Sequence, residues 1–276
     1  MDVKTGLAFQ SAGQRFLNQV NQANQAKNPA VEGGALSGLN AQPALNSFSQ
    51  DSTDFKTRQT PTVVALLEMP VDTPKITVGT KVLILGDSQT VGPYGKSIDE
   101  LARATGATVS THASWGASPY WFFNGNETYK YWTRDTVGQE DTRMQTGTPL
   151  LKDLLAAVQP DVVVVTMGGN MIAGNASQGE VTKQVSQIGN AVSASGAHLI
   201  WVGPPKYDPQ KRSPEVVEQF YQKLGNIVPE FGTLIDSRPH IEAYAGSDGL
   251  HYSGTKGEKI AREWAQGVFQ EIQKLD

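Results

Sequence analysis

The feature that most constrains the fold is an alternation of short apolar runs with helix-period segments from about residue 77 onward. Four consecutive valines within residues 161–166 indicate a strand that is buried on both faces, as in parallel sheets. In the segment that follows, Val181, Val185, Ile188 and Val192 recur at helical spacing. Strands that alternate with helices in this way predict a parallel sheet covered by helices on both faces.

The same reasoning extends to the rest of this region. We expect strands over residues 81–85, 107–112, 161–166, 198–202 and 233–235. We expect helices over residues 97–105, 150–158, 181–192, 214–224 and about 255–275. The predicted fold class is therefore α/β, a three-layer α/β/α flavodoxin-like domain with about five parallel strands.

Residues 1–76 have a different composition, rich in Gln, Asn, Ala, Ser and Gly and poor in aromatic residues. One interpretation is a disordered or weakly helical tail; the alternative is an attachment or assembly segment that orders against a partner. Residues 62–68 are apolar enough to form a strand or a packing segment. We therefore predict a polar N-terminal extension at 1–76 and a globular domain at 77–276.

The composition of the 276-residue chain excludes several kinds of chemistry. It contains no cysteine, which rules out disulfides, thiolate catalysis and cysteine-ligated metals. Its formal net charge of −4 gives no electrostatic reason to expect nucleic-acid binding. No apolar run is long enough for a membrane span, and residues 1–15 lack a signal-peptide pattern. We expect synthesis in the cytoplasm, with action outside a cell or on a virion by a non-classical route left open.

A candidate nucleophile, Ser88, follows the first predicted strand in the segment Gly86-Asp87-Ser88. A residue just past such a strand lies where α/β sheets place their chemistry, and a serine hydroxyl there needs a base to become a nucleophile. The alternative is a turn or N-cap serine that begins the next helix. The pattern Gly-x-Ser-x-Gly is absent, so the nucleophile elbow of the α/β-hydrolase fold is not indicated.

The best candidate for the base is His251. Asp248 precedes it by three residues in a glycine-containing loop, so its carboxylate can fold back onto Nδ1–H and leave Nε2 to face Ser88. The alternative is a loop aspartate that caps the last helix. The other histidines are two that we expect to be packed in or beside strands and one rival base: His112, His198 and His240.

Four short blocks of this chain, taken in order, resemble the SGNH (GDSL-like) hydrolases. These blocks are Gly86-Asp87-Ser88, Gly116 after the second strand, Gly168-Gly169-Asn170 after the third, and Asp248-Gly249-Leu250-His251 before the last helix. The resemblance covers about residues 80–275. It departs from the family at Met171, where aspartate is frequent.

The resemblance implies a serine esterase that uses neither a metal nor another cofactor. Ser88 would attack the ester carbonyl, and His251 would act first as base and then as acid, oriented by Asp248. The backbone N–H groups of Ser88 and Gly116 and the side-chain amide of Asn170 would form the oxyanion hole, where preorganised donors stabilise developing charge.

Residues 117–147 form a long insertion without clear periodicity, and 8 of the 22 aromatic residues lie within 113–147. Long irregular loops in compact domains are often functional. These aromatic side chains either form a small satellite core or contact substrate by stacking on sugar rings or holding an acyl group. The candidate substrate-binding residues are Tyr120, Trp121 and Trp132.

The predicted function is removal of a small acyl group, with acetyl favoured, from a carbohydrate or cell-wall polysaccharide through an acyl-enzyme. A lipid-type esterase and an O-acyltransferase are the near alternatives, because they would use the same residues. An alternative of another class is a glycan-binding structural or adhesion component of a phage particle or secretion assembly. The expected partners are an acylated glycan or small ester and an assembly partner for residues 1–76, with no nucleic acid and no membrane span.

Overall fold

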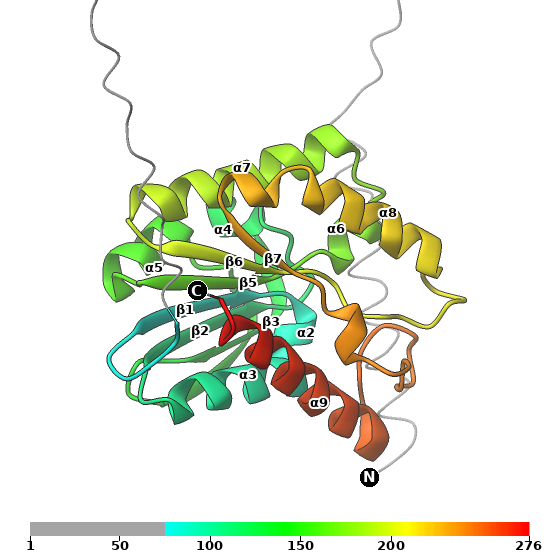
Figure 1. The fold of residues 1–276 in the computed structure, drawn as a ribbon, viewed down its shortest axis with the longest axis horizontal. Helices are drawn as coiled ribbons and strands as arrows, with labels where there is room; N and C mark the ends of the chain where they lie inside the picture. The colour runs from blue at the N-terminus through cyan, green and yellow to red at the C-terminus, as the bar shows by residue number, and fades with distance from the viewer. Residues whose placement is uncertain (1–74, 276) are drawn as a thin grey trace, which may run out of the picture.

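The computed structural model describes residues 75–275. The segment expected at 62–68 and most of the predicted extension therefore lie outside the described residues. In the described part, a seven-stranded sheet lies between two layers of helices (Figure 1). No helix within residues 75–275 is long and apolar enough to cross a membrane.

The strand order of the sheet is β4-β3-β2-β1-β5-β6-β7, and five adjacent strands run parallel. These five are β1 (Lys81–Gly86), β2 (Thr108–Ser114), β5 (Val162–Thr166), β6 (His198–Val202) and β7 (Gly232–Ile235). In the centre, Val82 of β1 pairs with Val109 of β2 on one side and with Val162 of β5 on the other. The α/β fold class and the parallel core predicted from the apolar runs are confirmed.

The predicted insertion instead extends the sheet. After the short helix α4 (Trp121–Asn124), β3 (Glu127–Arg134) pairs antiparallel with β2, and β4 (Glu140–Gly147) pairs antiparallel with β3. The expectation of a segment without regular structure is wrong here. Strand β4 is the edge strand, its residues are almost all exposed, and its sequence is polar, so no apolar alternation marks it.

Alternate residues of the central strand face two separate apolar cores. Val82 and Ile84 pack beneath α3 (Pro93–Ala104) and α9 (Gly254–Ile272), where the rings of Tyr94 and Trp264 stack with centroids 3.6 Å apart. On the opposite face, Leu83 and Leu85 belong to the core shared by α5 (Leu151–Val158), α7 (Gln178–Ala194) and α8 (Pro214–Gly225). Figure 1 shows these two helical layers on either side of the sheet.

Local capping signals determine where α7 and α8 begin; these two helices and α5 form the second layer. Ser177 and Glu180 form a reciprocal capping box at α7, and Ser213 caps α8 immediately before Pro214. The remaining helical segments are single short turns: α2 (Ser88–Val91), α6 (Gly169–Ala173), η1 (Val228–Glu230) and η2 (Arg238–His240). Of these, α2 and α6 follow the ends of β1 and β5 and thereby help to form the candidate site.

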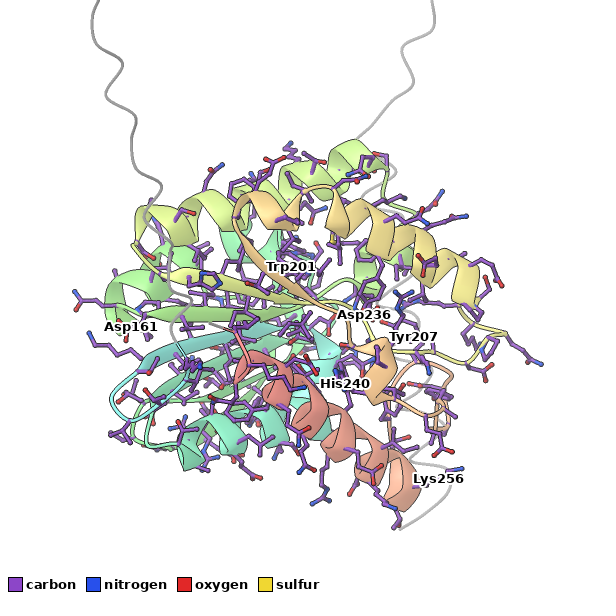
Figure 2. All side chains as sticks on the ribbon, in the orientation of Figure 1. Asp161, Trp201, Tyr207, Asp236, His240 and Lys256 are labelled. Carbon is purple, nitrogen blue, oxygen red and sulfur yellow. The ribbon has the colours of Figure 1, made fainter. Side chains whose placement is uncertain are left out.

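The carboxyl ends of the parallel strands lie along one edge of the sheet. Tyr207 and Asp236, which follow β6 and β7, lie at this edge, whereas Asp161, which precedes β5, lies at the opposite edge (Figure 2). Trp201 is fully buried between the sheet and the second layer, and its Nε1 donates to the carbonyl of Met167. Loops after successive parallel strands therefore converge, as expected for functional sites in this architecture.

Candidate active site

Ser88 lies at the carboxyl end of β1, as the first residue of the short helix α2. The turn that holds it requires glycine at position 86, because a Cβ there would lie only 1.9 Å from the hydroxyl oxygen of Thr90. Asp87 caps α2, with Oδ1 accepting a hydrogen bond of 2.9 Å from the backbone N–H of Gln89. The interpretation of Ser88 as an ordinary helix cap is therefore wrong, since Asp87 has that role.

Asp248 and His251 are joined within one closed loop before α9. The Oδ2 atom of Asp248 lies 2.6 Å from His251 Nδ1, while Oδ1 accepts from the backbone N–H groups of Leu250 and His251. The hydroxyl of Tyr244 also donates to Asp248 Oδ1, at 3.2 Å. Burial alone would raise the pKa of Asp248, but the hydrogen bonds from His251 and the Leu250 N–H outweigh it and hold that pKa well below its usual range.

The loop brings His251 to the serine, which is 163 residues away in the chain. His251 Nε2 lies 2.8 Å from Ser88 Oγ. The ionised Asp248 carboxylate favours the tautomer with its proton on Nδ1, which leaves the Nε2 lone pair to accept the serine proton. The three residues predicted as a catalytic set are therefore connected as hydroxyl, imidazole and carboxylate.

The predicted oxyanion-hole groups lie on the turns that adjoin this set. Gly116 has a φ of +84°, a conformation that favours glycine, and the preceding Trp115 contacts the ring of His251. The side-chain amide of Asn170 donates to the carbonyl of Ala117 at 2.8 Å, which ties the turn after β5 to the turn after β2. Within residues 75–275, the backbone N–H groups of Ser88 and Gly116 have no hydrogen-bond acceptor, so both are available as donors.

Asp87 is a second carboxyl group beside Ser88, but its environment differs from that of Asp248. It is 3% exposed, and burial raises its pKa to about 6 despite the opposing effects of the Gln89 N–H, His251 and Arg212. Its carboxyl oxygens make no hydrogen bond to His251 in the described part of the chain. Asp87 therefore shapes the turn and its electrostatics, whereas Asp248 orients the imidazole.

The three histidines that were set aside lie elsewhere. His112 is held in β2 by Ser110, Tyr131 and Thr133, and His198 at the start of β6 bonds Thr233. The rival base, His240, packs beside α9, where a Cβ on Gly267 would lie 2.5 Å from its ring (Figure 2).

Two of the three predicted substrate-binding aromatics are core residues. Trp121 is 7% exposed and packs under α5 and α7, and Trp132 is 2% exposed and packs against Val91 and Ala113. Neither presents a ring face to a ligand, so this prediction is wrong for both, because each ring is covered by the layers of the fold. Tyr120 is 45% exposed and stays a candidate.

Comparison with known proteins supports the architecture. No protein-family model and no curated protein matches the chain. A DUF4886 family protein from Bacteroides uniformis matches with a TM-score of 0.50 at 15% identity, over 72% of this chain and 86% of that one. LAE5, an alpha/beta hydrolase enzyme from the metagenome of Lake Arreo, Spain, matches with a TM-score of 0.50 at 10% identity, over 71% of this chain and 97% of that one. A protein from Slackia heliotrinireducens that has been assigned to the SGNH hydrolases matches with a TM-score of 0.49 at 21% identity, over 69% of this chain and 98% of that one.

The chain has an α/β fold that it shares with the DUF4886 family protein and with LAE5. The one departure from the SGNH blocks that the sequence resembles has a packing explanation. Met171 is 3% exposed and belongs to the core beneath the turn after β5, together with Met167 and Phe220. An aspartate at this position would be buried in an apolar cluster, which is costly for a charged group.

Sequence reasoning missed several residues that support the candidate site. The ring of Trp115 lies against that of His251 with centroids 4.5 Å apart, and Gln89 Nε2 donates to the Leu250 carbonyl at 2.8 Å. Tyr244 holds the same loop by accepting from the Gly249 N–H at 2.7 Å. Trp115 and Gln89 each adjoin a residue of a family block, and that adjacency was the available signal.

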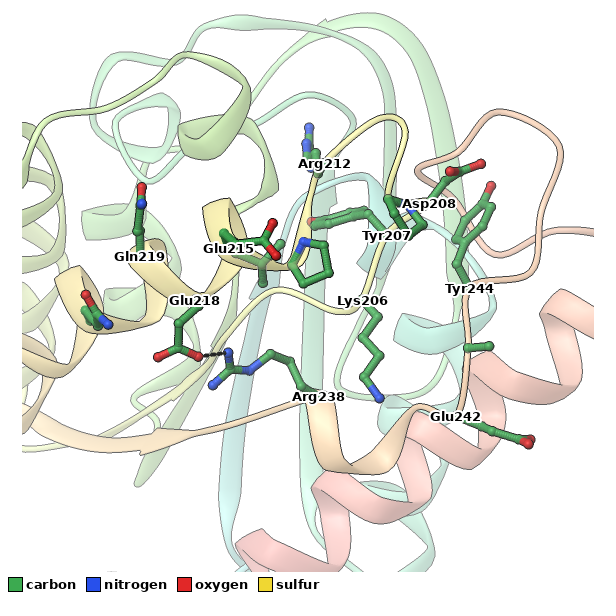
Figure 3. A pocket seen from close by; sticks show the side chains of 15 residues that line it. Lys206, Tyr207, Asp208, Arg212, Glu215, Glu218, Gln219, Arg238, Glu242 and Tyr244 are labelled. Carbon is green, nitrogen blue, oxygen red and sulfur yellow. Dashed lines mark hydrogen bonds and ion pairs between the residues drawn. The ribbon is translucent and has the colours of Figure 1, made fainter.

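A cavity of about 990 Å³ opens beside the site, between the loop after β6, the start of α8 and the segment from Arg238 to Tyr244 (Figure 3). Two of its lining residues also hold the loop of Asp248: the Tyr244 hydroxyl bonds Asp248, and the Asp208 N–H donates to the Gly249 carbonyl. Among residues 75–275, no group of three or more His, Asp or Glu side chains is arranged to hold a metal ion.

Proposed function

We propose that this protein is a serine ester hydrolase that works through an acyl-enzyme. The observation that carries the proposal is the continuous link from Ser88 Oγ to His251 Nε2 at 2.8 Å and from His251 Nδ1 to Asp248 Oδ2 at 2.6 Å. A serine hydroxyl is a poor nucleophile until a base takes its proton, and this geometry supplies the base and fixes its tautomer.

In the first half-reaction, Ser88 Oγ attacks the ester carbonyl carbon while its proton passes to His251 Nε2. Negative charge then develops on the carbonyl oxygen, where the N–H groups of Ser88 and Gly116 and one N–H of Asn170 would donate to it. Such donors are typically worth about 3 kcal/mol each in the transition state. His251 returns the proton to the leaving alkoxide, so the alcohol departs and the acyl group stays on Ser88.

In the second half-reaction, a water molecule replaces the alcohol and the same steps run in reverse. His251 takes a proton from the water, the resulting hydroxide attacks the acyl carbon, and Ser88 leaves with the proton that His251 returns. The product is a carboxylic acid, and the enzyme is regenerated. Asp248 remains ionised throughout and stabilises the imidazolium in both halves.

We propose acetyl, or another small acyl group on a carbohydrate, as the substrate. The adjoining cavity of about 990 Å³ supports this choice, because it is large enough for a sugar unit and its lining includes carboxylate and amide side chains that can hydrogen-bond to sugar hydroxyls. Transfer of the acyl group to a second sugar uses the same residues and differs only in whether water is excluded from the acyl-enzyme.

The test combines covalent labelling with a chain-length series. A fluorophosphonate should add one label to the wild type and none to Ser88→Ala, as measured by intact mass, while Ser110→Ala is labelled normally. The wild type should hydrolyse 4-nitrophenyl acetate faster than the butyrate and octanoate, and should release acetate from acetylxylan. Labelling of Ser88→Ala would overturn the nucleophile assignment, and faster cleavage of longer chains would favour a lipid-type esterase. Acetylation of an added sugar at the expense of free acetate would identify a transferase.

A further inference from the structure

Arg212 differs from the other arginines of residues 75–275 in having no carboxylate partner. Each of the others lies within 4 Å of an aspartate or glutamate: Arg103, Arg134, Arg143, Arg238 and Arg262. Arg212 is partly buried at the end of the loop after β6, just before the N-cap of α8. A partly buried cation without a counter-ion is costly, and a carboxylate of a bound ligand would compensate that cost.

The guanidinium of Arg212 is held next to the candidate oxyanion hole. Its carbon lies 4.4 Å from the ring centroid of Tyr207, which is 5% exposed and therefore fixed. A Cβ on Gly169 would lie 2.9 Å from Arg212 Nη1 and 2.5 Å from the Tyr207 hydroxyl. Gly169 directly precedes Asn170, so both groups sit over the turn that carries the proposed oxyanion donor.

The charge of Arg212 also reaches the nucleophile turn. It opposes the rise in the pKa of Asp87, the residue before Ser88, although burial still raises that pKa to about 6. No ion pair joins Arg212 to Asp87 among the described residues. Among the described residues, the guanidinium therefore hydrogen-bonds with Tyr207 and interacts with Asp87 only at longer range than an ion pair.

The cavity beside the site gives Arg212 access to a ligand, and the other cations that line it are already engaged. Lys206 Nζ donates to the Ile241 carbonyl at 2.6 Å, and Arg238 pairs with Glu218 and Asp236. Arg212 points away from the Arg238–Glu218 pair (Figure 3). The acidic groups that line the cavity are Asp208, which accepts from the Gln210 N–H, Glu215, which accepts from Ser213, Glu218 and Glu242.

We propose that Arg212, supported by Tyr207, is a specificity-determining residue that binds a carboxylate of the ester substrate. The inference rests on the proposed hydrolase function and deepens it, because it names acidic esters as the substrate class. A guanidinium presents two parallel N–H donors that match a carboxylate, and its location beside Asn170 would position such an ester for attack by Ser88.

The experiment compares two matched pairs of esters in the full chain. 4-Acetoxybenzoate and its methyl ester differ by a carboxylate on the alcohol side, and 4-nitrophenyl succinate and its methyl ester differ by one on the acyl side. The ratio of kcat/KM for anionic over neutral ester should fall roughly tenfold in Arg212→Gln in one of the pairs. Arg212→Lys should fall between, and Arg262→Gln, which alters an exposed arginine on α9, should keep the wild-type ratio.

Two results would overturn the inference and leave the hydrolase proposal intact. In one, Arg212→Gln leaves the anionic-to-neutral kcat/KM ratio unchanged in both pairs of esters. In the other, Arg262→Gln lowers that ratio as much as Arg212→Gln does. If the wild type hydrolyses neither neutral ester, the hydrolase proposal fails instead. Binding then decides the inference by itself: ligand-observed NMR should detect the anionic esters on Ser88→Ala and weaker binding on Ser88→Ala/Arg212→Gln. Equal binding to both variants would overturn it.

Discussion

Two serine–histidine pairs in this domain have nearly the same hydrogen-bond length and very different surroundings. Ser88 Oγ lies 2.8 Å from His251 Nε2, and Ser110 Oγ lies 2.9 Å from His112 Nε2. At His251 the second nitrogen meets the carboxylate of Asp248, whereas at His112 it meets the hydroxyls of Tyr131 and Thr133. The hydroxyl-to-imidazole contact alone therefore does not distinguish a candidate catalytic pair from a structural one.

The distinction lies in the partner on Nδ1 and in the location of the pair. His112 lies on a central strand, where burial lowers its pKa to about 4 and keeps the ring neutral. His251 lies on a loop at the carboxyl end of the sheet, beside turns whose Ser88 and Gly116 N–H groups have no acceptor in the described part of the chain. An ionised carboxylate stabilises the imidazolium that forms when serine gives up its proton, and a hydroxyl does so much less.

The largest expected effect separates the two serines. Ser88→Ala should lower kcat/KM for 4-nitrophenyl acetate by roughly 10⁴-fold or more, because no other group can hold the acyl intermediate. Ser110→Ala should keep activity within about twofold of wild type and lose only some stability. Steady-state kinetics on both variants checks this, and equal losses would remove the distinction between the pairs.

The partners on Nδ1 provide the next comparison. Asp248→Asn should reduce kcat by roughly a hundredfold or more, because an amide neither fixes the Nδ1 proton nor stabilises the imidazolium. Tyr131→Phe removes the hydroxyl beside His112 and should leave kcat unchanged. Folding of each variant is verified by its melting temperature. A mild effect of Asp248→Asn would mean that the loop orients His251 without help from this charge.

Acid stability should report on His112. In the unfolded chain, the imidazole of His112 has a pKa near 6.5 and is protonated below that pH. In the folded protein, burial lowers this pKa to about 4, so the ring stays neutral down to that pH. Stability is therefore lost as the pH falls through this window, by up to about 3 kcal/mol from this group. In His112→Gln, the drop in melting temperature between pH 7.5 and 4.5 should be several degrees smaller than in wild type. An identical drop in both proteins would contradict the burial argument.

The smallest expected effect concerns the aromatic ring next to each of the two histidines, His251 and His112. Trp115 contacts His251 with centroids 4.5 Å apart, whereas Tyr131 and His112 are 6.1 Å apart. An aromatic face stabilises a nearby cation, so Trp115→Leu should lower kcat about threefold to tenfold, with a smaller change in KM. A change confined to KM would instead indicate that Trp115 contacts the substrate.

Much of this arrangement could be predicted because its signals are local or repeat in order. Apolar runs such as Val162–Thr166 marked the parallel strands, and the blocks around Ser88 and His251 indicated the candidate triad. The roles of Trp121 and Trp132 could not be predicted, because an aromatic ring in a polar segment looks the same in sequence whether it packs inward or faces solvent. Strand β4 was missed because a solvated edge strand carries no apolar alternation.

The sequence by itself determined the parallel α/β core and the identity of the serine, histidine and aspartate that lie together. Apolar runs and their period are local properties of the sequence, and Asp248 lies close enough to His251 in the chain for its carboxylate to reach the imidazole. Tertiary structure alone decided three features of residues 75–275: which serine–histidine pair adjoins N–H donors without an acceptor in that range, that β3 and β4 extend the sheet, and that Arg212 has no carboxylate partner there. These features depend on distances between different segments of the chain. Those distances become fixed only when helices pack on both apolar faces of the sheet.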